Sequence, residues 1–449
     1  LGYEDLPPEV IRVVKYSFLD TLGVTLAAST LGEGCRPFVR LARQWGGKKQ
    51  STILGFGLKA PAPTAALVNG AMAHALDFEE VHDEATVHPS ASTFPAALAL
   101  AEGQGRISGR RVITALALGN ELVIRLGRAV SVDPLQYGWF LPPILGAFGA
   151  VVAAGKILEL TADQLLSALS LVLCQTSFSA EIARSPQSHI REVRDGFSAQ
   201  AGVLSALLAA EGITGFEHPL EGEAGVFALY FRGNFNQEEF LAGLGQRFYL
   251  SRTSFKPWPS CRGTHAYIQA ALELRDRGLE PQQISRVNLE VAQLNRMLCE
   301  PAKERANPKT AIGAKFSLPF VVATALVRGQ VSLGSFSAEA LADEEVVALA
   351  RKVYYRVNPS LRPSEGVMEV MTGEGKVYSR RVESVLGSPQ NPMSEEQLRS
   401  KFIECATYSA KKLKPGELEQ LTQLILALEE VQDIRTITAQ LSGGPDGQA

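Results

Sequence analysis

Apolar residues recur at helical spacing along most of the first half of the chain. Between residues 7 and 29 they stand at Val10, Ile11, Val13, Val14, Phe18 and Leu19. This spacing buries one stripe of a helix. Comparable runs, separated by short stretches rich in Gly, Pro and Asp, predict further helices within 63–78, 93–104, 109–130, 142–160 and 161–175. We therefore predict one large all-helical domain over residues 1–254.

Several of these segments carry alanine and glycine on nearly every side, as in 63–78 and 142–160. Helices of this composition are usually buried, because small side chains let helix axes approach closely. We expect them to pack tightly against one another inside the helical domain.

The pattern changes after residue 254. Val287, Leu289 and Val291 alternate with polar residues in the manner of a strand, and 349–361 and 365–384 contain further strand-like runs. Helical runs lie among them, and helical spacing returns near the C-terminus. The predicted fold class is mainly α, with an all-helical domain (1–254 and 391–449) and a smaller α+β domain (255–390) inserted before the C-terminal helices.

Composition and charge exclude some functions. A formal net charge of −3 and an isoelectric point near 6.2 give no reason to expect nucleic acid or an anionic membrane as partner. The apolar stretches are too short, or too interrupted by Gly and charge, to predict a membrane span. Five scattered cysteines without a CxxC pair are typical of a reducing compartment, so we expect a cytoplasmic protein.

The segment 74–92 contains three of the six histidines and five acidic residues. We expect a helix to end near Phe78 with Asp77 at its C-terminal end, and a loop to follow, because Pro89 disfavours helix at His88. His82 and His88 are six positions apart, which does not match helical zinc spacing, so no metal is expected. Two interpretations remain: a solvated acidic turn, or a loop in which His88 transfers protons at a carbon next to a carboxylate.

Basic residues gather in two other segments. Lys256, Arg262 and His265 lie in or beside a proline-containing loop before a helix, which suits either a carboxylate site or a rigid hinge. Arg191 and Arg194 stand three apart, which suits either a surface face of a helix or an anion site. The chain has no P-loop, GxSxG or HExxH motif.

The segments 69–102, 256–274 and 314–329 resemble, in this order, the MmgE/PrpD family. That family includes 2-methylcitrate dehydratase, cis-aconitate decarboxylase and iminodisuccinate epimerase, and the resemblance spans roughly residues 3–410. It implies a helical domain and a smaller α/β domain with the active site in the cleft between them, a small polycarboxylate substrate, a homodimer, and no metal or other cofactor.

The resemblance also implies site residues. Asp77 and His88 correspond to the pocket-lining aspartate and histidine of the family, and Ser90 of the same His-Pro-Ser motif is a candidate for substrate binding. Lys256 and His265 match the second motif. The candidates for catalysis are therefore His88, Asp77 and Lys256. Arg262 and His265 are candidates for substrate binding.

Three positions depart from the family pattern. Phe140 stands where dehydrating and decarboxylating members commonly have a histidine, and Arg191 and Arg194 replace a usual lysine–histidine pair. Arginine keeps a positive charge but does not act as a base at neutral pH, and phenylalanine transfers no protons. All three are substrate-binding candidates.

The sequence thus predicts a cofactor-independent lyase that acts next to a carboxylate of a small di- or tricarboxylate. His88 would move the proton, and Asp77 would orient His88 or a neighbouring group. Lys256, Arg191 and Arg262 would hold the carboxylates of the substrate. Two alternatives stay open. One is an epimerase that returns the proton to the other face, and the other is a family member that binds a ligand without catalysis.

Overall fold

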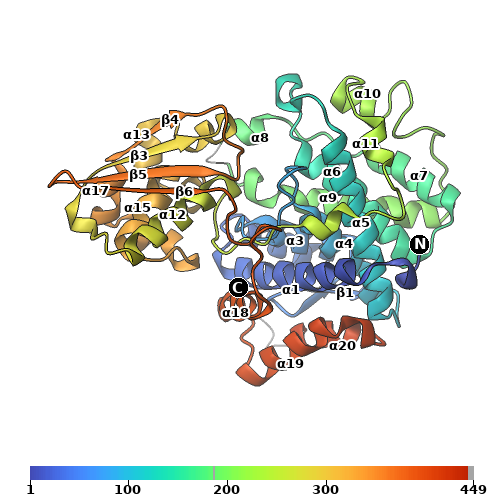
Figure 1. The fold of residues 1–449 in the computed structure, drawn as a ribbon. Helices are drawn as coiled ribbons and strands as arrows, with labels where there is room; N and C mark the ends of the chain where they lie inside the picture. The colour runs from blue at the N-terminus through green and yellow to red at the C-terminus, as the bar shows by residue number, and fades with distance from the viewer. Residues whose placement is uncertain (186–187, 443–449) are drawn as a thin grey trace. The chain divides into compact units, whose positions relative to one another are not determined.

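The computed structural model describes residues 1–185 and 188–442. Its contacts divide the chain into two compact units, Leu1–Phe255 with Ser394–Ala449, and Lys256–Met393. Figure 1 shows that helices make up most of the secondary structure, so the predicted mainly-α class is confirmed.

The first unit is built from helices of very different length. Its long helices are α1 (Pro8–Leu31), α2 (Cys35–Trp45), α3 (Ala62–His74), α4 (Pro89–Gly103), α5 (Gly109–Ala129), α6 (Leu141–Leu158), α7 (Ala162–Leu173), α9 (Ile190–Ala210), α18 (Glu395–Thr407) and α19 (Pro415–Leu426). Its short ones are α8 (Glu181–Arg184), α10 (Val226–Phe231), α11 (Gln237–Leu241), α20 (Arg435–Leu441) and the 3₁₀ helices Tyr3–Asp5, Pro134–Tyr137, Tyr249–Arg252 and Leu428–Glu430.

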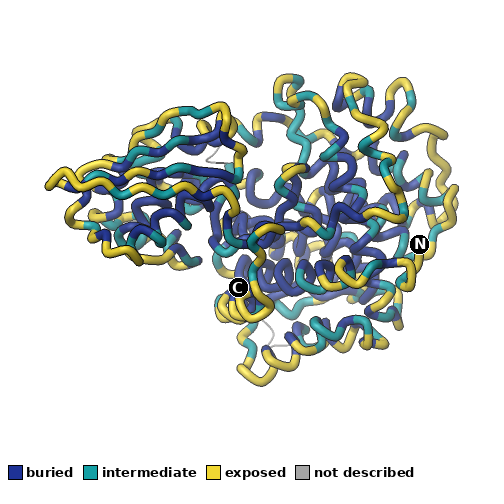
Figure 2. The backbone as a smooth tube through the Cα atoms, in the orientation of Figure 1, coloured by how far each residue is buried: buried dark blue, intermediate teal, exposed yellow. Residues whose placement is uncertain are grey.

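Small residues let the central helices of this unit touch backbone to backbone. A Cβ atom on Gly196 of α9 would lie 2.8 Å from the backbone nitrogen of Ala71 in α3, and one on Gly149 of α6 would lie 2.8 Å from the carbonyl oxygen of Gly119 in α5. Figure 2 shows α3, α4 and α6 buried along almost their whole length. The tight packing expected from their composition is confirmed.

The first unit is not entirely helical, which corrects the predicted all-helical domain. Strands β1 (Ser51–Ile53) and β2 (Leu58–Ala60) form an antiparallel hairpin. Gly55 and Gly57 both have positive φ, which the turn between the strands requires. Glu102 of α4 accepts hydrogen bonds from the backbone nitrogen and the hydroxyl of Thr52. Strands of three residues are too short to show an alternation in the sequence.

The C-terminal helices belong to the first unit. Lys401 of α18 forms a buried ion pair with Asp20 of α1 at 2.6 Å. The same ammonium group donates to the carbonyl oxygen of Phe78 at 2.7 Å. A helix from the end of the chain therefore holds the segment that follows α3.

Helix α6 is, within the described residues, the one helix long and apolar enough to cross a membrane by length and composition. This corrects the expectation that every apolar stretch is too short or too interrupted, because the helix begins at Leu141 and runs 18 residues. Of its 18 residues, 72% are buried, and the helix packs against α5 and α9. Its apolar surface is that of a core helix.

The second unit has a four-stranded sheet with the order β4-β3-β5-β6. Its strands are β3 (Ile284–Val291), β4 (Val353–Val357), β5 (Gly366–Thr372) and β6 (Val377–Val382), and β3 runs parallel to β4 and antiparallel to β5. Its helices are α12 (His265–Asp276), α13 (Ala302–Ala306), α14 (Ala311–Lys315), α15 (Leu318–Arg328), α16 (Ala338–Leu341), α17 (Glu344–Ala350) and the 3₁₀ helices Arg262–Thr264, Pro281–Gln283, Gln293–Leu298 and Leu333–Phe336. The strands predicted here are confirmed.

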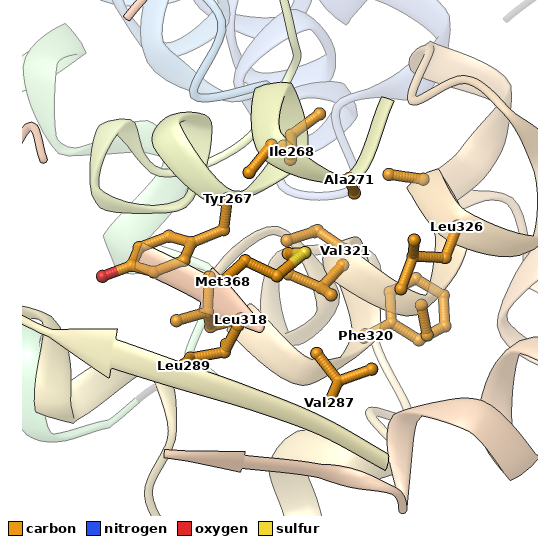
Figure 3. Packing of buried hydrophobic residues seen from close by; sticks show 14 of the residues in the cluster. Tyr267, Ile268, Ala271, Val287, Leu289, Leu318, Phe320, Val321, Leu326 and Met368 are labelled. Carbon is orange, nitrogen blue, oxygen red and sulfur yellow. The ribbon is translucent and has the colours of Figure 1, made fainter. Parts of the chain in front are cut away.

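Helices α12 and α15 build the core of the second unit. Figure 3 shows their side chains Ile268, Ala271 and Val321 gathered with Val287 and Met368 of the sheet. Alternate residues of β3 are buried, as the period of a strand with one covered face demands.

Candidate active site

The segment 75–80 turns sharply after α3. The helix ends at His74 rather than near Phe78, which corrects the predicted boundary. Asp77 has a φ of 49°, in the left-handed region, and its backbone nitrogen donates to the carbonyl oxygen of His74 at 2.9 Å. Asp is one of the few residues besides Gly that adopt this conformation readily. Asp77 and Glu80 therefore lie in the turn and not on the helix.

His82 is buried, so the expectation that it lies on the surface of the loop, implied by a solvated acidic turn, is wrong. Its Nε2 atom donates to the carbonyl oxygen of Tyr249 at 3.2 Å, and its Nδ1 atom accepts from the backbone nitrogen of Ala85 at 3.2 Å. Burial lowers the pKa of His82 to about 4. Both ring nitrogens serve the fold of the loop, and a neutral ring satisfies them.

His88 directly precedes α4, and one of its ring nitrogens lies close to both a carboxylate and a carbonyl oxygen. Its Nδ1 atom lies 3.1 Å from Oε1 of Glu79 and 3.1 Å from the backbone oxygen of Glu80. A carbonyl oxygen only accepts hydrogen bonds, so Nδ1 carries the proton. The Nε2 atom of neutral His88 is consequently the nitrogen that can accept a proton.

His74 approaches the same carboxylate from α3. Its Nδ1 atom hydrogen-bonds Oε1 of Glu79, and its ring centroid lies 5.0 Å from that of His88. A carboxylate oxygen of Asp77 lies within 4.8 Å of the ligand atoms of the other three residues. We call His74, Asp77, Glu79 and His88 the histidine cluster.

The electrostatics of the cluster favour an ionised Glu79. Burial alone would raise the pKa of its carboxyl group, but the imidazoles of His74 and His88 hold that pKa well below its ordinary value. Burial and the nearby Arg194 lower the pKa of His74. Among the described residues, Oε2 of Glu79 has no hydrogen-bond partner. A buried acceptor without a donor is costly and is typical of functional sites.

Helix α9 brings Arg194 and Asp195 to the cluster. Oδ2 of Asp195 lies 3.9 Å from Nδ1 of His74 and 3.5 Å from Nε of Arg194, and Oδ1 accepts from the hydroxyl of Ser92 at 3.0 Å. The guanidinium of Arg194 lies 5.0 Å from the ring centroid of Phe140. Two predicted residues, Phe140 and Arg194, are thus in contact, and Arg194 lies close enough to His74 to affect its pKa.

Both arginines of this helix are buried, so the surface-face interpretation is wrong for them. Arg191 donates through Nη1 to the carbonyl oxygen of Ile182 at 3.2 Å, and Arg194 donates to the carbonyl oxygen of Arg191. Buried guanidinium groups need compensating partners, which makes them candidates for binding an anion.

Ser90 anchors the first turn of α4. Its hydroxyl oxygen accepts from the side-chain amide of Asn120 at 3.0 Å, and its backbone nitrogen donates to Oε1 of Glu80 at 2.9 Å. Its role in substrate binding stays a prediction.

The carboxyl group of Glu80 has different neighbours from that of Glu79. Its Oε2 atom accepts from the hydroxyl of Thr21 at 3.1 Å. Burial, and then the negative charge of Asp20, raise the pKa of Glu80 to about 7. Glu80 is therefore protonated in a substantial fraction of molecules at neutral pH.

The remaining predicted residues belong to the second unit. Lys256 and His265 are fully buried. Nε2 of His265 donates to the carbonyl oxygen of Ser260 at 3.1 Å, and its ring packs edge-on against Trp258 with centroids 5.3 Å apart. Arg262 donates through Nη1 to the carbonyl oxygen of Leu386 at 3.4 Å. That these residues act together with His88 stays a prediction.

The histidine cluster has the donor types that could hold a divalent metal ion. The hydrogen bonds within the cluster fit protonated ring nitrogens better than they fit a bound metal ion. Nδ1 of His88 donates to a carbonyl oxygen and Nδ1 of His74 faces a carboxylate, and a protonated ring nitrogen does not ligate a metal. A metal ion would have to use Nε2 atoms or displace these protons.

Sequence reasoning missed His74, Glu79 and Asp195. His74 and Glu79 lie in the polar segment that was singled out, but only the left-handed turn at Asp77 reveals which acid meets the imidazoles. Asp195 lies more than a hundred positions away from them, and only the close packing of α3 on α9 joins it to the site.

The described residues thus form a mainly helical protein in which two imidazoles meet one buried carboxylate, groups that can carry protons. A model of the MmgE/PrpD N-terminal domain matches residues 1–238, and a model of the MmgE/PrpD C-terminal domain matches residues 258–425. The chain belongs to the MmgE/PrpD family, as the sequence motifs indicated.

Relatives match along nearly the full chain. Cis-aconitate decarboxylase of Aspergillus terreus is 27% identical over 98% of this chain and 94% of its own length. The cis-aconitate decarboxylases of Mus musculus and Homo sapiens are each 26% identical, over 99% and 98% of this chain and 91% of their own lengths. The family and these relatives identify the chain as an enzyme of the lyase type.

Proposed function

We propose that the chain is a cofactor-independent lyase that removes carbon dioxide or water from a small tricarboxylate, or from a dicarboxylate of similar shape. The observation that carries this proposal is the hydrogen bonding of His88. Its Nδ1 proton is held by Glu79 and by the backbone oxygen of Glu80, which assigns proton exchange to Nε2. The relatives named cis-aconitate decarboxylase support the substrate class.

The proton chemistry follows from this tautomer. In loss of carbon dioxide, the carbon–carbon bond to one carboxylate breaks, its electron pair spreads toward a second carboxyl group, and protonated His88 delivers a proton to carbon. In loss of water, neutral His88 takes the proton from the carbon next to a carboxylate and the hydroxyl group leaves. An imidazole can both take and give a proton, which suits either direction.

Fixed cations would stabilise the negative charge that builds up on the substrate. Arg191 and Arg194 are buried in the first unit, and a desolvated guanidinium binds a carboxylate more strongly than an exposed one. We also propose Lys256 and Arg262 for this role, on the family pattern alone. Asp77 would orient the substrate or a neighbouring proton-carrying group.

Phe140 favours a second candidate, an epimerase. Its ring packs against the guanidinium of Arg194, so the position where lyases of the family commonly carry a histidine here supports a cation instead. An enzyme that lacks this proton donor would have more difficulty expelling a hydroxyl group. Removing and returning an α-proton makes no such demand.

The test is an NMR assay in D₂O with cis-aconitate, 2-methylcitrate and a series of smaller dicarboxylates. A lyase gives a new product with loss of carbon dioxide or water, whereas an epimerase gives deuterium at the α-carbon and the opposite stereoisomer. We expect His88→Ala to lower kcat at least ~1,000-fold, because it removes the group that moves the proton. The exposed His218, paired with Glu221, provides the control His218→Ala, which should keep full activity.

A carboxylate that binds measurably without elimination or exchange, across the whole series, would contradict the enzymatic proposal. It would favour the third possibility, a family member that binds its ligand without converting it. Near-normal turnover in His88→Ala would instead remove His88 from the mechanism.

A further inference from the structure

Two imidazoles converge on a single oxygen of Glu79. The histidines come from different elements, His74 from the end of α3 and His88 from the start of α4, and both present Nδ1 to Oε1. The carboxylate is therefore held from two sides. This arrangement is not required to close the turn, since the backbone bond from Asp77 to His74 already does so.

We propose that Glu79 is the positioning residue of His88. Together with the backbone oxygen of Glu80 it fixes the ring tautomer with the proton on Nδ1. It also balances the charge of the ring when Nε2 gains a proton, and is itself held in place by His74. The catalytic consequence rests on the proposed function, whereas the tautomer does not.

Glu79 fits this role better than the other acids nearby. Its Oε1 atom lies 3.1 Å from Nδ1 of His88, within hydrogen-bonding distance. Oδ2 of Asp195 stays 3.9 Å from Nδ1 of His74, and its other oxygen is engaged by Ser92. The carboxyl group of Glu80 accepts from Thr21 and from the backbone of Ser90, so Glu80 meets His88 only through its carbonyl oxygen.

The second imidazole explains how a flexible carboxylate can act as a rigid support. A glutamate has three side-chain torsions, and a single hydrogen bond to His88 would leave it free to swing. The buried ring of His74 hydrogen-bonds the same oxygen and packs against His88 with centroids 5.0 Å apart. The positions of both the carboxylate and the ring are therefore set by the packing of α3 and α4.

Several charged groups surround the pair and belong to the same electrostatic balance. From the turn and from α9 they are Asp77, Glu80, Arg194 and Asp195. Arg194 and Asp195 form an ion pair at 3.5 Å, so their opposite charges partly cancel at the cluster. Glu79 is the acid hydrogen-bonded to the ring, and its removal should act on His88 more strongly than removal of Asp195.

The first experiment needs no substrate. Nitrogen NMR of the protein labelled at histidine distinguishes the two neutral tautomers, and His88→Gln assigns the signal among the six histidines. We expect neutral His88 to carry its proton on Nδ1 in the wild type, and the share of the Nε2 tautomer to rise in Glu79→Gln, where the backbone oxygen of Glu80 is left as the charge-free acceptor for Nδ1. A wild-type His88 that carries its proton on Nε2 overturns the proposal whether or not the variant folds.

The second experiment uses whichever substrate the D₂O assay identifies. Glu79→Gln should lower kcat by about 100-fold with KM changed less than about threefold, and should move the acid limb of the kcat/KM profile to lower pH by about one unit. Glu79→Asp keeps the negative charge on a shorter side chain. The acid limb of its kcat/KM profile should therefore lie close to that of the wild type, while its kcat should stay lower. Glu102→Gln, which alters a buried carboxylate that holds Thr52, is the matched control and should leave the profile unchanged.

The two experiments separate the possible failures. If no carboxylate is turned over but the tautomer depends on Glu79, the proposed function fails and the positioning role stands. If turnover is found and its pH profile is the same in Glu79→Gln as in the wild type, the positioning role fails and the proposed function stands.

Discussion

Glu79 and Glu80 are neighbours in one turn and both are fully buried, yet their carboxyl groups behave in opposite ways. Glu79 meets the imidazoles of His74 and His88, and its pKa lies well below the ordinary value despite burial. Glu80 meets a hydroxyl group, an amide and the nearby charge of Asp20, and burial raises its pKa to about 7. Burial is common to the two, so the charge of the neighbours decides which acid is ionised.

This difference separates the candidate active site, which lies around the carboxyl group of Glu79 (the Glu79 side), from the packed core around the carboxyl group of Glu80 (the Glu80 side). The Glu79 side joins α3, α4 and α9, and contains every imidazole and guanidinium group that we assign to proton transfer or anion binding within the first unit. The Glu80 side joins α1 and α4, and the positive charge of Lys401 is already matched there by Asp20. One turn thus presents an anion to the site and a neutral acid to the core.

The largest structural effect should come from separating the helices on the Glu79 side. Gly196→Ala places a methyl group 2.8 Å from the backbone nitrogen of Ala71, which neither helix backbone can avoid. We expect a loss of about 3 kcal/mol in the free energy of unfolding. Chemical denaturation measures it.

Gly416→Ala is the control for this variant, because nothing lies within 4 Å of a Cβ atom at that position of α19. It should leave stability within about 0.5 kcal/mol of the wild type. Equal stability of Gly196→Ala and Gly416→Ala would show that α3 and α9 are not held at this distance, and the link between Asp195 and the histidine cluster would then be lost.

The second prediction concerns the pH dependence of stability on the Glu80 side. The folded protein holds the Glu80 proton to about pH 7, whereas the unfolded chain releases it near 4.5, so stability should fall as pH rises between these values. The shift corresponds to about 3 kcal/mol. Glu80→Gln keeps an acceptor for Ser90 and offers its amide to the oxygen of Thr21, and it removes the charge.

We therefore expect Glu80→Gln to match the wild type near pH 4.5 and to be more stable by about 2–3 kcal/mol at pH 8. Unfolding curves at several pH values measure the difference. Glu79→Gln should show the opposite sign, with stability lost relative to the wild type at neutral pH and the difference shrinking as the pH falls. If both variants changed stability in the same direction at pH 8, the contrast between the two acids would be wrong.

The sequence predicted the helical and strand-forming segments and the family, because periodicity and motifs are local properties. The role of His88 stays a prediction. It did not predict the end of α3, because the left-handed conformation of Asp77 leaves no periodic signal. It also did not predict the burial of His82. The burial of Arg191 and Arg194 depends on how α9 packs, which a spacing of three cannot reveal.

A smaller effect should follow from the hydroxyl group that supports Glu80. Thr21→Val removes the donor to Oε2 while keeping the shape of the side chain, and should cost about 1 kcal/mol, more at pH 8 than at pH 5 because the ionised acid needs the donor more. Thr25→Val is the control, since its hydroxyl bonds only the backbone oxygen of Thr21 one turn earlier. A loss that does not depend on pH would place Thr21 outside the environment that sets the ionisation of Glu80.

The smallest effect on kcat is expected from removing metal ions. This experiment tests whether the Glu79 side holds protons or a metal ion. If His74 and His88 hold protons on Nδ1, a chelator should change kcat less than about twofold, and added Zn²⁺ should inhibit by competing for the ring nitrogens. The activity and the histidine nitrogen spectrum, each recorded with EDTA and then with excess Zn²⁺, measure both effects. Loss of activity in EDTA and its recovery with Zn²⁺ would make Glu79 a metal ligand. The two neighbouring acids would then differ because a metal ion, rather than two imidazoles, holds one of them in its ionised form.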